Sequence, residues 1–138
     1  LVIKELNLKK SDIKTYLDHA YRHGIPIKGL ENLKEQLFGL EANLEKLNGI
    51  DFKKGCYIGQ ENTARMKLKN KIRRQLVSIK SEKNLKIGDE IKYNDKIVGR
   101  ILIDKPYPFA LIKLFDPDFS VFKDKKLKIN ESNVEIIS

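Results

Sequence analysis

The chain has 138 residues, enough for one ordinary domain or for two small subdomains that share a core. No apolar run approaches the roughly 20 residues that a membrane-spanning helix needs, and a single cysteine excludes an internal disulfide. These features predict a cytoplasmic protein with no membrane partner. Because the chain begins with Leu1 and not Met, we expect it to be a piece of a longer protein.

The charge balance is strongly basic, with a formal net charge of +9. Such an excess is typical of nucleic-acid-binding surfaces. Lys and Arg together number 28, however, and only five are arginine, the residue preferred for bidentate contacts to phosphates and bases. The composition favours a generic solvated lysine face and leaves open a weak nucleic-acid contact through it.

The first half of the chain predicts an α+β segment. Leu1–Leu8 alternates apolar and polar residues, as a short strand does. Ser11 is placed to cap a helix whose apolar stripe begins at Ile13 and which ends at Gly24. Further short helices are predicted over residues 30–38, 41–47 and 60–67.

The second half changes to the period of strands. Strands are predicted over residues 76–79, 90–93, 97–103, 109–115, 126–129 and 134–137. Asn94-Asp95 between two of them predicts a hairpin. Short strands with Pro and Gly at their joints favour a small antiparallel barrel. The predicted class is therefore α+β, with an α+β segment over 1–72 and a β-barrel domain over 73–138.

Cys56 lies in a glycine-rich run that is the most informative part of the sequence. Gly55 and Gly59 flank it and permit close approach of a ligand to the backbone. A following helix and the neighbouring lysines would give the thiol thiolate character. The same residues fit a second interpretation, in which Cys56 is a small buried residue in a turn.

The whole run is Lys54-Gly55-Cys56-Tyr57-Ile58-Gly59-Gln60-Glu61, with Arg65 four residues after the Glu. It resembles the signature of the YgfZ family and its mitochondrial counterpart. Gly24-Ile25-Pro26, Asn43-Leu44 and Gly49-Ile50-Asp51-Phe52-Lys53 resemble other segments of that family at the usual spacing. The resemblance covers the whole chain and identifies it with the later portion of such proteins.

The resemblance implies a fold related to the glycine-cleavage T-protein, an aminomethyltransferase, with tetrahydrofolate as the cofactor of the full-length protein. It also implies a folate-associated accessory role in maturation or repair of iron–sulfur enzymes, including tRNA-modifying ones, with such a client enzyme as partner. Cys56 would be the functional thiol. The residues that would shape its loop and the folate channel are Lys54, Gly55, Tyr57, Gly59, Gln60, Glu61 and Arg65.

One position departs from the family pattern. Arg22 stands where the family has a glutamate two residues before the Gly of the Gly-Ile-Pro turn. A pterin presents hydrogen-bond donors that suit a carboxylate, so Arg22 weighs against folate binding by this part of the chain alone.

Two alternative functions remain open at this point. The first is a tetrahydrofolate-dependent aminomethyltransferase of the T-protein class, the only turnover reaction the resemblance supports. The second is a tRNA-binding module using the basic stretch 67–74, which lacks interleaved aromatic residues. His19 and His23 are four residues apart on a predicted helix, but no further ligand completes a set, so no metal site is expected.

Overall fold

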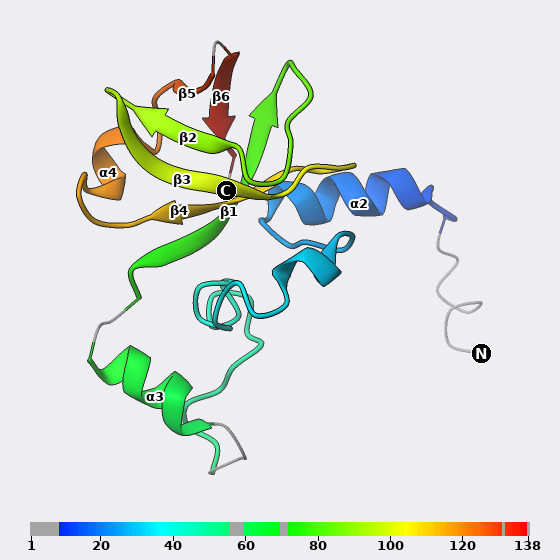
Figure 1. Cartoon of the computed structure of the whole chain (residues 1–138). Helices are drawn as coiled ribbons and strands as arrows, with labels where there is room; N and C mark the ends of the chain where they lie inside the picture. Colours follow the sequence, from blue (N-terminus) through cyan, green and yellow to red (C-terminus); the bar gives the residue numbers. More distant parts are fainter. Residues whose placement is uncertain (1–8, 56–59, 70–71, 131, 138) are drawn as a thin grey trace.

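The computed structural model describes residues 9–55, 60–69, 72–130 and 132–137. Helix α2 (Ile13–Arg22), the 3-10 helix η1 (Leu30–Leu33) and helix α3 (Gln60–Leu68) come first (Figure 1). Strands β1 (Arg74–Ser81), β2 (Glu90–Tyr93), β3 (Lys96–Ile103) and β4 (Phe109–Lys113) follow, and then helix α4 (Phe119–Phe122), β5 (Leu127–Ile129) and β6 (Ser132–Ile136). None of the helices in these ranges has the length and apolar composition that crossing a bilayer requires.

The six strands form a closed barrel in the order β1-β4-β3-β2-β5-β6, and all neighbouring strands are antiparallel. Strand β1 closes it, because residues 74–78 pair with β4 and residues 79–81 pair with β6. The predicted α+β class with a small barrel is thus confirmed. Each predicted strand is present, with ends within two residues of those expected.

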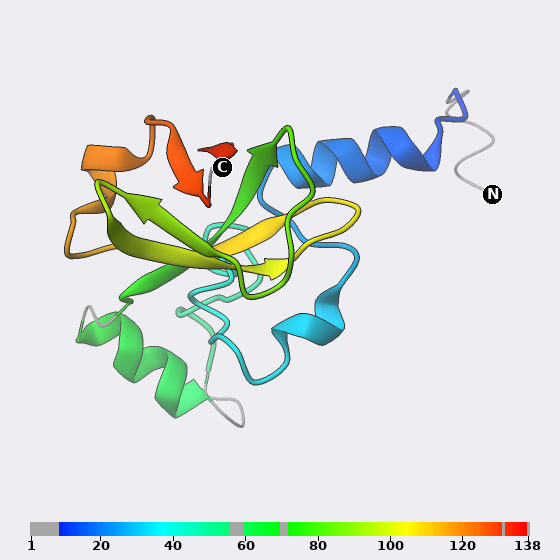
Figure 2. The same cartoon turned by 45° about the horizontal axis from the view of Figure 1, so that its top comes forward.

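Two apolar clusters hold the molecule together. The larger fills the barrel and includes the fully buried Val77, Ile101 and Phe122. The second cluster consists of buried residues on the outer side of β1, β3 and β4, and its members are Leu76, Leu102, Ile103, Phe109 and Leu111. Side chains from α2, η1 and the segment after η1 cover it. The ribbons of α2 and η1 accordingly lie next to the barrel in Figure 2.

The β2–β3 connection is a two-residue turn, as the sequence predicts. Asn94 and Asp95 have φ values of 47° and 62°. Positive φ at both central residues is the requirement of a type I′ turn, whose twist matches the flanking strands. Asparagine and aspartate tolerate this conformation better than other residues with a Cβ.

The predicted helices over 30–38 and 41–47 are wrong. Only Leu30–Leu33 is helical in the first range, and Glu35 has a φ of 59°. Residues 41–48 form turns, with φ values of 61° at Asn43 and 58° at Asn48. Because a left-handed residue interrupts the helical hydrogen-bond pattern, the apolar spacing alone was misleading there.

Helix α2 begins and ends close to the predicted positions. Asp12, and not Ser11, is the N-cap, and its side chain accepts a hydrogen bond from the Lys14 N–H at 3.3 Å. Gly24 has a φ of 69° just beyond the helix, as expected for a C-terminal stop. The strand predicted over Leu1–Leu8 lies outside the described residues, and α4 was not predicted.

Candidate functional site

The motif segment, residues 54–61, follows the turns over residues 34–48 (the turn region) and leads into α3. Cys56, Tyr57 and Gly59 lie outside the described residues. On the near side, Lys54 and Gly55 are exposed, and a Cβ added to Gly55 would meet no atom of the described residues within 4 Å. On the far side, α3 begins at Gln60, so the helix expected directly after the motif is confirmed.

Helix α3 presents the two other described members of the predicted set. Glu61 and Arg65 are exposed and four residues apart, so they lie on one face of the helix. Helix α3 lies outside the barrel, next to the turn region that precedes the motif (Figures 1 and 2). Both side chains are therefore open to a ligand or partner.

Lys67 connects the two sides of the motif segment. Its ammonium group forms an ion pair with Glu45 and lies 4.1 Å from the centroid of the Phe52 ring. Glu45 and Phe52 precede the motif and Lys67 follows it, so these contacts join the two flanks of the motif segment. Exposed ion pairs and cation–π contacts each contribute about 0–1 kcal/mol, so these contacts between the flanks are weak.

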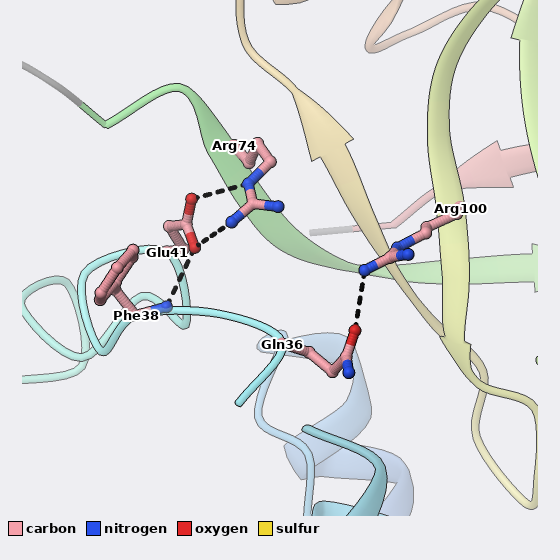
Figure 3. Close-up of polar contacts among 5 residues, drawn as sticks. All are labelled: Gln36, Phe38, Glu41, Arg74 and Arg100. Atoms are coloured by element: carbon pink, nitrogen blue, oxygen red, sulfur yellow. Dashed lines mark hydrogen bonds and ion pairs between the residues drawn. The ribbon is translucent and has the colours of Figure 1, made fainter. Parts of the chain in front are cut away.

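The turn region before the motif is fixed more firmly to the barrel. The carboxylate of Glu41 is buried and accepts two hydrogen bonds from Arg74, at 2.9 Å to Nε and 3.0 Å to Nη2 (Figure 3). It also accepts the Phe38 backbone N–H at 3.0 Å. A bidentate Arg–carboxylate pair is among the stronger polar contacts, so Glu41 orients this region relative to β1.

Asn43 adds a second connection to the same strand. Its side-chain amide donates to the Leu76 carbonyl at 2.7 Å, and its carbonyl oxygen accepts from Gln75 at 2.7 Å. The Leu76 N–H in turn donates to the Glu41 backbone carbonyl at 2.7 Å. The segment leading into the motif is thus held to β1 through the carboxylate and the backbone carbonyl of Glu41 and through the nitrogen and oxygen of the Asn43 side-chain amide.

Helix α2 is fixed to the opposite part of β1 and to the β3–β4 connection. The Tyr21 hydroxyl donates to the Ile79 carbonyl, and its ring packs edge-on against Phe109. The Tyr107 hydroxyl donates to Asp18 at 2.6 Å. Burial raises the pKa of Tyr21 to about 12, and the hydrogen bond to Asp18 raises the pKa of Tyr107.

The described motif residues do not by themselves form a pterin pocket. A depression of about 470 Å³ lies between the turn region and the end of the barrel, lined in part by Asn43, Glu45, Gln75 and Phe115. Neither Arg22 nor the described motif side chains of Lys54, Glu61 and Arg65 line this depression or four other, smaller depressions on the described surface. None of these five depressions is therefore a pterin site built from the predicted residues.

The histidine pair on α2 is exposed. The ring centroids of His19 and His23 are 4.5 Å apart. Within the described ranges, no group of three or more His, Cys, Asp or Glu side chains is arranged to hold a metal ion.

Sequence reasoning did not assign a role to Glu41 or Asn43, and it considered Lys67 only as part of the basic stretch 67–74. Asn43 carried a partial signal, because it belongs to a pair of residues at the family spacing and tolerates positive φ. Glu41 carried none, since its partner Arg74 is 33 positions away in the sequence.

The fold and the motif together define a class: an α+β protein in which a glycine-rich cysteine motif precedes a small closed barrel.

No family model matches the chain. It is 43% identical over 72 residues to the mouse "Iron-sulfur cluster assembly factor IBA57, mitochondrial" and 38% identical over 74 residues to the homologue of that factor from Phaeosphaeria nodorum. It is also 38% identical over 104 residues to the "tRNA-modifying protein YgfZ" of Buchnera aphidicola. The chain is therefore a relative of the YgfZ proteins and of their mitochondrial IBA57 counterparts, and the resemblance seen in the sequence is confirmed.

The matches cover a limited part of these relatives. They span 51% of this chain and 20% of the mouse protein, 54% and 18% for the Phaeosphaeria protein, and 67% and 32% for the Buchnera protein. The chain thus spans a third or less of the length of the curated relatives it matches.

Proposed function

We propose that the full-length protein carrying this chain is an accessory factor for maturation or repair of iron–sulfur enzymes, with Cys56 as its functional thiol. The observation that carries this proposal is the similarity to relatives named as iron–sulfur cluster assembly factors and as a tRNA-modifying protein. The partner is an iron–sulfur client enzyme, tRNA-modifying enzymes included. A cytoplasmic location is part of the proposal.

The geometry around the motif supports a role in which this segment presents Cys56 to the client enzyme. The preceding turn region is held to the barrel by Glu41 and Asn43, whereas the polar contacts of α3 that the described residues show are the exposed ones of Lys67. We propose that a firmly held flank before the motif gives Cys56 a defined position relative to the barrel. The charged residues Lys54, Glu61 and Arg65 are exposed within or just after the motif segment and are available to contact the client.

Tetrahydrofolate belongs to the proposal only for the full-length protein. Arg22 is exposed at the last turn of α2, lines none of the five depressions, and offers donors where a pterin needs acceptors. We propose that residues outside this chain supply the pterin contacts, and that the motif residues complete the channel.

The proposal is tested by complementation in a strain that lacks its own YgfZ-type protein. The full-length protein and its Cys56→Ala variant are compared by the activity of an iron–sulfur tRNA methylthiolase. Rescue by the parent and loss of rescue by the variant at equal expression are expected. Cys56→Ser serves as the matched variant, because it keeps a small polar side chain and removes the sulfur.

Two outcomes would change the proposal in different ways. Rescue by all three proteins would keep the maturation role and reduce Cys56 to a structural residue. A well-expressed parent that rescues nothing would contradict the maturation role, and folate-dependent one-carbon transfer by the full-length protein would then be the function to measure.

A further inference from the structure

Three lysines gather around a depression at one end of the barrel, away from the motif. The depression measures about 440 Å³ and lies where the β2–β3 turn meets strand β5. Its charged and amide-bearing lining residues are Lys92, Lys126, Lys128, Asp95, Asn94 and Asn130. All six are exposed, so the depression is open to solvent.

Two of these lysines are directly opposed across neighbouring strands. Lys92 of β2 and Lys128 of β5 are register partners, and partners in an antiparallel pair project to the same face. Like charges in this position destabilise a sheet, whereas opposite charges stabilise it. The pairing therefore costs some stability, which an anion between the two ammonium groups would offset.

No carboxylate of the described chain neutralises this pair. The ion pairs within the described ranges join Lys67 to Glu45, Arg74 to Glu41 and Lys96 to Asp116. None involves Lys92, Lys126 or Lys128. Asp95 lines the same depression but supplies a single negative charge against three positive ones.

The turns around the depression supply neutral donors as well. Asn94 and Asn130 come from two different hairpins and have φ values of 47° and 52°. Each ammonium group offers three donors and each side-chain amide offers two. Donors from two strands and two turns around one concave surface suit a group with several acceptor oxygens, and lysine is a common phosphate ligand.

We infer that this depression is a phosphate-binding site, formed by Lys92, Lys126 and Lys128 with the Asn94 and Asn130 amides. The phosphate belongs either to a single-stranded polynucleotide or to a free nucleotide, and both share the chemistry that the site recognises. The depression is of a size that accepts a ligand as large as a nucleotide. None of its lining residues belongs to the basic stretch at 67–74 or to the motif segment 54–61.

The test compares binding by the 138-residue chain and by two double variants of equal charge. Lys92→Gln with Lys128→Gln removes the opposed pair, and Lys80→Gln with Lys83→Gln removes two exposed lysines outside the depression. A labelled 12-nucleotide single-stranded RNA is titrated by fluorescence anisotropy at several salt concentrations. Each lost phosphate contact lowers the magnitude of the slope of log K against log salt by about 0.7. The slope of the first variant should therefore be smaller by about 1.4, and the slope of the control variant should not change.

The source of the phosphate is decided by NMR titration of the backbone amides of residues 92–95 and 126–130. Saturating shifts with RNA but not with AMP or inorganic phosphate assign the site to a polynucleotide. Saturation with AMP, at an affinity no weaker than for RNA, assigns it to a free nucleotide. Shifts spread over the whole lysine surface, or tighter binding of an acidic peptide, overturn the inference.

A third variant, Lys92→Glu, separates lost binding from lost folding. It places opposite charges across β2 and β5, so it should raise the thermal midpoint while abolishing binding. Equal loss of binding in the control double variant would mean a diffuse charge effect and would also overturn the inference.

Discussion

At the scale of single residues, a few polar side chains decide how the first half of the chain meets the barrel. Glu41 is buried and hydrogen-bonded, whereas Arg74 is only partly covered. Asn43 bonds to two successive residues of β1. These contacts lie between segments more than 30 positions apart in the sequence.

Replacing Glu41 by Gln should lower the free energy of unfolding by about 1–3 kcal/mol, because Arg74 loses its charged partner next to a buried group. Urea unfolding measures the change. Glu45→Gln is the matched control: its ion pair with Lys67 is exposed and should cost no more than about 1 kcal/mol. Equal losses in the two variants would contradict the structural role given to Glu41.

The stability of the fold should fall as the pH rises from about 10 towards 12. Burial raises the pKa of Tyr21 from its ordinary value of 10.0 to about 12, so the folded state keeps a proton that the unfolded state releases. The stabilisation is complete below pH 10 and is lost as the pH approaches 12. The thermal midpoint should drop between pH 8.5 and pH 11, and this drop should be smaller in Tyr21→Phe than in the parent. Tyr16→Phe, at an exposed position, should behave as the parent does.

At the scale of elements, the strands have the secondary structure that their local sequence predicts, and the turn region does not. The barrel strands are buried or half-buried and carry β-branched and large apolar residues, which matches both their period and their propensity. Residues 34–48 contain helix-forming residues, yet Glu35, Asn43 and Asn48 adopt positive φ. Tertiary hydrogen bonds outweigh helix propensity there, which is worth only a few tenths of a kcal/mol per residue.

The β2–β3 turn provides a test of local conformation. Asp95→Val should lower the free energy of unfolding by about 1–2 kcal/mol, because a β-branched residue is strained at positive φ. Asp95→Gly should be at least as stable as the parent, since glycine suits a type I′ turn. Chemical denaturation of the two variants gives the comparison. A Val variant as stable as the Gly variant would argue against the turn type described.

At the scale of the whole molecule, the barrel and the first half of the chain share a core. The second cluster lies on the outer side of the barrel and is covered by residues including Tyr21, Leu33 and Leu37. Apolar burial contributes roughly 25 cal/mol per Å², so uncovering this surface has a substantial cost. The division into domains 1–72 and 73–138 remains a prediction, and this shared cluster argues that the two parts unfold together.

A fragment of residues 73–138 should therefore be less stable than the whole chain and should bind a hydrophobic dye. Circular dichroism of the strands and fluorescence of a label on α2 should give coincident unfolding curves for the intact chain. Two separate transitions, together with a fragment as stable as the parent, would show instead that the barrel is an independent unit.

The sequence by itself determined the barrel, its strands, the β2–β3 turn and the helix after the motif, because short-range period and turn chemistry dominate in those segments. It also carried the motif that relates the chain to YgfZ proteins. Only the tertiary structure decided the turns over residues 34–48, the Glu41–Arg74 contact, and the opposed Lys92 and Lys128. These depend on which segments meet in space, and no local pattern records a partner that lies 30 or more positions away.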